Sequence, residues 1–136
     1  MLIHPIPICL AVILPVSMMC APARAHHSYA QYDRCSNVSI EGEIQHITWS
    51  NPHVVIILKT EKSVDYRIEW FNVQRLARYG IGQETLQAGD RVIITGSENR
   101  DPEEKIVTLL TGLNRTSDDW FWSRPFPVNP PAPCTD

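Results

Sequence analysis

Residues 38–49 read VSIEGEIQHITW, and this stretch decides the fold. Apolar and polar residues alternate over Val38–Ile44, which predicts a strand with one buried face. The apolar positions then shift by one residue to Ile47 and Trp49, which predicts a β-bulge near Gln45-His46. Gly42, inside the strand, indicates a bend or the close approach of another backbone. We therefore expect a long, bent first strand.

Four more strands and one short helix are expected after it. The strands cover residues 53–58, 64–70, 91–96 and 106–113. Asn72 is a suitable helix N-cap and Gly80 a suitable residue just past the helix, so a helix of about two turns is expected between them. The order β-β-β-α-β-β with a bent first strand is typical of the OB-fold, a small five-stranded Greek-key barrel. The fold class expected is all-β with one short helix, and an open meander covered by the helix is the alternative.

The segment 114–136 has a different composition. It contains the aromatic residues Trp120, Phe121, Trp122 and Phe126 among five prolines. This proline density excludes a regular helix or a central strand. We expect an OB-like domain over residues 26–113 and a tail over 114–136 that packs on the barrel through its aromatic side chains.

Residues 1–25 are expected to be a secretory signal peptide. The apolar run Ile8–Val16 is shorter than the about 20 residues that a bilayer-spanning helix needs. Ala23-Arg24-Ala25 fits the small-residue pattern that signal peptidase cleaves. Cleavage there would start the mature chain at His26 and would place the protein in the periplasm or outside the cell. A lipid anchor at Cys20 and an uncleaved membrane anchor are the alternatives.

The length and charge of the mature chain limit what it can be. Removing 25 residues from 136 leaves 111, which is enough for one domain. The net charge of −3 becomes −4 when Arg24 is removed, and an acidic exported chain is a poor candidate for nucleic-acid binding. No stable membrane insertion is expected after cleavage.

Two cysteines, Cys35 and Cys134, remain after cleavage. In an oxidising compartment they are expected to form a disulfide, and two unpaired thiols are the alternative. Their spacing fits no zinc motif. By loop-closure entropy, such a bridge would stabilise the fold by about 4 kcal/mol.

The predicted N-terminus is a candidate copper site. An α-amine with a pKa of about 7.7–8 can lose its proton to a metal at neutral pH. The amine and imidazole of His26 would suit Cu(II), with a second imidazole from His27, His53 or His46. The alternative is that the terminal histidines are only solvated.

Other candidate sites give weaker signals. Trp49, Tyr66 and Trp70 could form a stacking platform for a ligand, as in many OB barrels, although their spacing favours core packing. Glu41 and Glu43 share one strand face, which favours a solvated surface over an acid/base pair. The sequence contains no nucleophile elbow and no phosphate loop, so no enzymatic activity is expected.

Three segments resemble one bacterial family. They are His26-His27-Ser28, residues 44–53 ending in WSNPH, and residues 86–96, LQAGDRVIITG. Together they resemble the small exported proteins known as domain of unknown function 6152, over roughly Ala25–Leu113. The resemblance implies a periplasmic bacterial protein without an assigned activity, and the family pattern includes the histidines at 26, 27 and 53. The cysteine pair and the long tail depart from that pattern.

Two functional hypotheses follow from the sequence. The first is an exported, non-catalytic OB-like module that binds an unidentified small ligand or a periplasmic partner protein. The second is a copper-binding protein that uses the mature N-terminal histidine. The sequence identifies no other cofactor.

Overall fold

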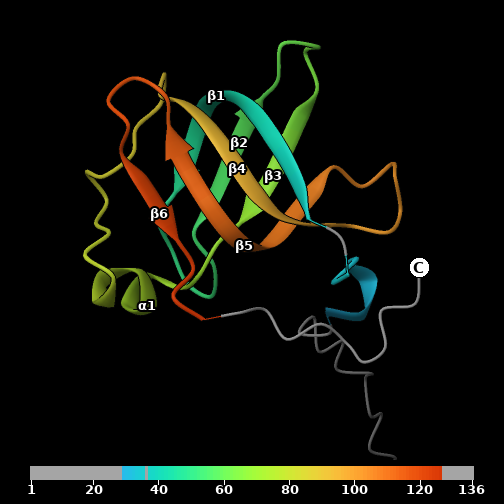
Figure 1. Ribbon diagram of the computed structural model, residues 1–136, viewed down its shortest axis with the longest axis horizontal. Coiled ribbons are helices and arrows are strands. Elements are labelled where there is room, and N and C mark those ends of the chain that lie inside the picture. Colours follow the sequence, from blue (N-terminus) through green and yellow to red (C-terminus); the bar gives the residue numbers. More distant parts are fainter. Residues whose placement is uncertain (1–28, 36, 127–136) are drawn as a thin grey trace, which may run out of the picture.

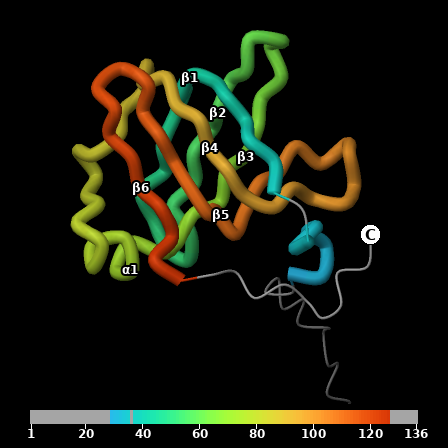
Figure 2. Tube along the Cα trace, in the orientation of Figure 1, coloured from blue at the N-terminus to red at the C-terminus, as the bar shows by residue number. Residues whose placement is uncertain are grey.

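The computed structural model describes residues 29–35 and 37–126. Figures 1 and 2 show a small barrel with one short helix at one end. In chain order the elements are η1 (Tyr29–Gln31), β1 (Val38–Thr48), β2 (Val55–Lys59), β3 (Asp65–Glu69), α1 (Val73–Arg78), β4 (Arg91–Glu98), β5 (Ile106–Arg115) and β6 (Phe121–Ser123). The predicted class, all-β with one short helix, is confirmed.

The sheet closes into a barrel through one parallel pairing. The strand order is β3-β2-β1-β4-β5-β6, and β3 also pairs with β5. The closing register places Arg67 opposite Ile106 and Ile68 opposite Val107. The OB-like five-stranded barrel is therefore confirmed, the open meander is excluded, and β6 is an additional edge strand.

Strand β1 is bent and pairs with a different neighbouring strand along each of its halves. Residues 38–43 pair with β4, and residues 43–48 pair with β2. The predicted bulge is present, because the register shifts between Ile44 and His46. A Cβ atom placed on Gly42 would lie 2.5 Å from the carbonyl oxygen of Lys59. Only glycine permits this close approach between the two strands.

Helix α1 begins and ends at the predicted residues. The side chain of Asn72 accepts a hydrogen bond from the backbone N–H of Arg75 at 2.8 Å. Gly80 follows the helix with φ of 73°, a left-handed conformation that favours glycine. Leu76, on the inner face of α1, is fully buried in the core. These contacts fix α1 against the end of the barrel (Figure 1).

The observed strand ends differ slightly from the prediction. β4 ends at Glu98 and β5 at Arg115, so each continues two residues beyond the expected end. β2 begins at Val55, and His53 precedes the strand. Hydrogen bonding to neighbouring strands carries β4 and β5 past the residues where the alternation of apolar side chains weakens.

Strand β6 is the main feature that the sequence did not predict. It pairs antiparallel with β5, with Trp122 opposite Leu113. Trp122 joins the core at 8% exposure, whereas Phe121 is 72% exposed and Phe126 is 59% exposed. Trp120 is half-buried against the same core. Residues 121–123 contain no proline, so this short piece of the tail can donate to a strand ladder.

Several sequence predictions concern residues outside the described part. The signal peptide, His26, His27 and Cys134 all lie there. Among the described residues, no helix is long and apolar enough to cross a membrane.

Candidate functional site

His53 has a fixed orientation at the end of the barrel. Its Nδ1 atom lies 2.8 Å from the backbone carbonyl oxygen of Trp70, and its side chain is half-buried. A carbonyl oxygen can only accept, so Nδ1 carries the proton and donates it. In the neutral ring the lone pair then resides on Nε2. A histidine that ligates a metal usually has this arrangement, with the other ring nitrogen bonded to a carbonyl or carboxylate.

His53 lines a small cavity of about 20 Å³ together with the N-terminal end of the described chain. Tyr29, Trp70, Phe71 and Arg124 line this cavity together with His53. Its volume is enough for a single water molecule. Tyr29 is the first residue that the structure describes. The polypeptide therefore enters the described fold beside His53.

The other predicted metal ligands are placed differently. His46 is exposed on β1 and does not line this cavity. His26 and His27 lie outside the described residues. Within residues 29–35 and 37–126, no group of three or more His, Cys, Asp or Glu side chains could hold a metal ion.

The structure does not gather the three predicted aromatic ligand residues. Trp70 is 3% exposed and packs edge-to-face on Trp122, with ring centres 5.1 Å apart. Trp49 and Tyr66 are half-buried against the core. Tyr66 lines a separate pocket, and Trp70 does not. Trp70 is thus a core residue and offers no open stacking surface.

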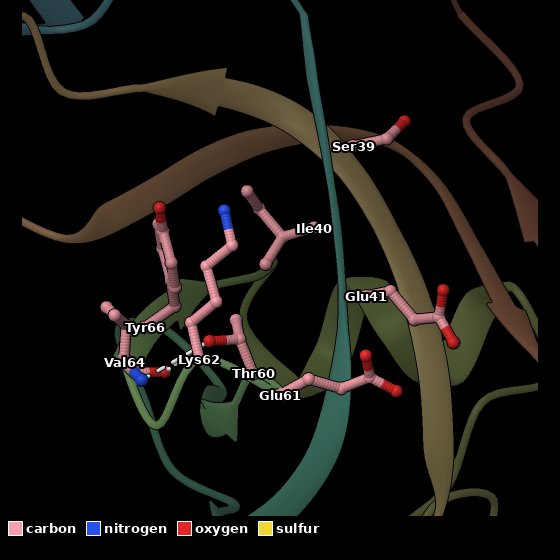
Figure 3. Close-up of a pocket in the computed structure, with 8 residues that line it drawn as sticks. All are labelled: Ser39, Ile40, Glu41, Thr60, Glu61, Lys62, Val64 and Tyr66. Carbon is pink, nitrogen blue, oxygen red and sulfur yellow. Dashed lines mark hydrogen bonds between the residues drawn. The ribbon is translucent and has the colours of Figure 1, made fainter.

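The pocket beside Tyr66 has a volume of about 300 Å³ and lies between β1 and the hairpin that joins β2 to β3 (Figure 3). Ile40, Val64 and Tyr66 supply its apolar surface. Figure 3 shows Lys62 extending alongside Tyr66 and Ile40. Burial raises the pKa of the Tyr66 hydroxyl, and the nearby Glu98 carboxylate raises it further. The alternation of β1 and β3 predicts that Ile40 and Tyr66 each lie on the apolar face of their strand. It could not show that they share a pocket, because β2 lies between the two strands in the sheet.

The acidic residues of β1 take part in surface ion pairs. Arg91 on β4 donates to Glu41 at 3.0 Å and also to Glu61 in the β2–β3 hairpin. These two hydrogen-bonded carboxylates raise the pKa of Arg91. Glu43 is exposed. The arrangement is that of a solvated, ion-paired face.

Comparisons with known proteins agree with the sequence resemblance. No curated protein matches the chain. The sequence pattern of the family of unknown function DUF6152 matches residues 14–108, which include His53 and most of the barrel. The chain therefore belongs to the family of unknown function DUF6152.

Proposed function

We propose that the protein is an exported OB-fold binding module whose ligand is a copper ion, held at the end of the barrel by His26 and His53. The observation that carries the proposal is the hydrogen bond from His53 Nδ1 to the carbonyl oxygen of Trp70, which leaves Nε2 with a free lone pair. This bond sets both the tautomer and the ring orientation before any metal binds.

The position of Tyr29 supports ligands from the residues before it. Two residues, His27 and Ser28, stand between His26 and Tyr29. The three steps of chain span at most about 3.6 Å each, so His26 and Tyr29 can be no more than about 11 Å apart. Because Tyr29 and His53 line the same cavity, we propose that the amine and imidazole of His26 bind the copper ion together with the Nε2 atom of His53. His27 is a further imidazole in the same short segment. Amine and imidazole nitrogens are ligands that suit Cu(II).

Export is part of the same proposal. Cleavage after Ala25 creates the α-amine on His26, and this cleavage accompanies secretion to the periplasm or beyond. In that compartment Cys35 and Cys134 would form a disulfide. The acidic chain would act as a soluble binding protein without an enzymatic role, and it would bind neither nucleic acid nor membrane.

Two histidine variants test the proposal with a matched control. The mature protein beginning at His26 is stripped of metal with a chelator and titrated with Cu(II) by calorimetry. We expect His53→Gln to weaken copper binding at least about tenfold, because one ligand is lost. His46→Gln removes an exposed imidazole outside the cavity and should leave the affinity unchanged. Equal affinity in His53→Gln and the unaltered protein would refute the assignment of His53.

A second candidate function is the binding of a small organic ligand in the Tyr66 pocket. The pocket combines apolar walls with the Lys62 ammonium group, which forms no ion pair among the described residues. The two carboxylates that also line it, those of Glu41 and Glu61, are paired with Arg91. This combination fits a small molecule with an apolar ring and a carboxylate. Benzoate titrated by NMR should shift the Tyr66 ring signals, and Lys62→Gln should weaken the effect while Lys59→Gln should not. Absence of a saturable shift would rule out this ligand class.

A further inference from the structure

Helix α1 and the end of β6 lie at the same end of the barrel (Figure 1), and each contributes one arginine there. Arg75 belongs to α1, and Arg124 directly follows β6. Both guanidinium groups contact the ring of Phe71. The Cζ atoms of Arg75 and Arg124 lie 4.0 and 4.9 Å from its centre, so both cations share one aromatic ring. They are close enough for the charge of Arg75 to act on Arg124 and lower its pKa.

Neither cation is balanced by a carboxylate in the described part of the chain. The five ion pairs found there all involve Arg67, Arg91 or Arg115. The chain as a whole is acidic, with a net charge of −3. Two neighbouring arginines without a counter-charge are unfavourable, because like charges at short range repel each other.

Arg124 is also incompletely hydrogen-bonded. Its Nε atom donates to the carbonyl oxygen of Leu110 at 2.7 Å. Its Nη2 atom is buried and has no hydrogen-bond partner among the described residues. Burial lowers the pKa of Arg124, and the charge of Arg75 lowers it further. A buried donor on a charged group is costly when it has no acceptor.

Each arginine is held in place by the fold. The Arg75 guanidinium stacks on Phe71 and its Nε atom contacts the Tyr79 hydroxyl at 3.4 Å. Phe71 itself packs edge-to-face on Trp122, which belongs to the core. The two cations thus rest on a rigid aromatic support, so they are positioned in advance for a partner of opposite charge.

We infer that Arg75 and Arg124 form a binding site for an oxyanion, the phosphate or carboxylate group of a ligand. A guanidinium fork presents two parallel N–H donors that match such a group. An oxyanion bound by the two guanidinium groups would neutralise the repulsion between the two cations. Two positive charges favour a doubly charged group such as phosphate. This inference does not depend on copper binding.

The test uses inorganic phosphate and metal-free mature protein. We expect saturable one-to-one binding of phosphate at low ionic strength. Calorimetry and the NMR shifts of the Phe71 ring measure this binding. Arg75→Gln and Arg124→Lys should weaken binding at least about tenfold, since a charge-assisted pair is lost in the first and the fork geometry in the second. Acetate should bind more weakly than phosphate at the same site.

Arg78→Gln is the matched control, because it makes the same charge change on the same helix. Arg78 is exposed and has no described contact with Phe71, so its variant should bind phosphate within about twofold of the unaltered protein. An equal loss in Arg75→Gln and Arg78→Gln would show diffuse attraction alone and overturn the site. No saturable binding by the unaltered protein would overturn it as well. If circular dichroism shows that Arg124→Lys does not fold, the comparison of Arg75→Gln with Arg78→Gln tests the site on its own.

Discussion

The Nδ1 atom of His53 lies 2.8 Å from the carbonyl oxygen of Trp70, a residue whose ring is in the core. This bond ties the orientation of a surface-accessible imidazole to the packing of the barrel. Trp70 in turn packs on Trp122, so the β6 strand supports the same end of the fold. The candidate metal ligand is therefore positioned by the core and by the edge strand together.

Trp122 should be essential for stability although it lies in the proline-rich tail. Trp122→Ala removes a buried ring that contacts Trp70, Phe71 and Tyr79, and we expect it to cost about 3–5 kcal/mol in the free energy of unfolding. Phe121→Ala changes a neighbour that is 72% exposed and should cost less than about 0.5 kcal/mol. Urea denaturation measures both. Similar small losses would mean that β6 is not part of the folded core.

Local sequence signals predicted much of the fold. The bulge beside Ile44, the N-cap at Asn72 and the glycine after α1 each depend on residues within a few positions of one another, so the sequence reveals them. β6 could not be predicted in this way. Its three residues pair with β5, and this pairing buries Trp122. The stabilisation gained by burying Trp122 depends on a surface that only the folded barrel provides.

The candidate sites were less accessible to sequence reasoning. His53 could be selected as a ligand from its residue type, but its tautomer depends on the carbonyl of Trp70, 17 residues away in the chain. The pairing of Arg75 with Arg124 arises because α1 and the end of β6 meet over Phe71. Such contacts between distant segments have no local sequence pattern.

Gly42 should tolerate no side chain. In Gly42→Ala the new Cβ would lie 2.5 Å from the Lys59 carbonyl oxygen, so β1 and β2 must separate locally. We expect a loss of about 1–3 kcal/mol in unfolding free energy.

Gly112→Ala is the control for this substitution, because the nearest atom to its Cβ would be 3.9 Å away. Its stability should change by less than about 1 kcal/mol in either direction. Thermal or urea unfolding of the two variants gives the comparison. A tolerated Gly42→Ala would contradict the close approach of the two strands.

Asp118 should make the fold sensitive to acid. Arg115 donates two hydrogen bonds to its carboxylate, at 2.9 and 2.8 Å, and these lower the pKa of Asp118 below its ordinary value of 3.8. The folded state therefore favours the ionised form. The resulting stabilisation is present above pH 3.8 and is lost as the pH falls through the lower pKa of the folded state.

Asp118→Asn should accordingly have a lower melting temperature than the unaltered protein at pH 7, with a difference that shrinks as the pH falls below about 4. Asp119→Asn changes the adjacent carboxylate, which receives no described hydrogen bond, and should leave the pH profile unchanged. Melting curves between pH 7 and pH 2.5 measure the effect. A difference that stays constant over this range would exclude the Arg115 interaction as its cause.

The most direct test of the copper proposal is the terminal amine itself. Two mature proteins are compared, one beginning at His26 and confirmed by intact mass, the other carrying one added methionine before His26. Cu(II) binding is followed by calorimetry and by the nitrogen couplings in electron paramagnetic resonance spectra. We predict one-to-one binding by the first protein and at least about tenfold weaker binding by the second, because the chelate of amine and imidazole on His26 is lost. Equal affinity and identical spectra for the two proteins would contradict the proposal.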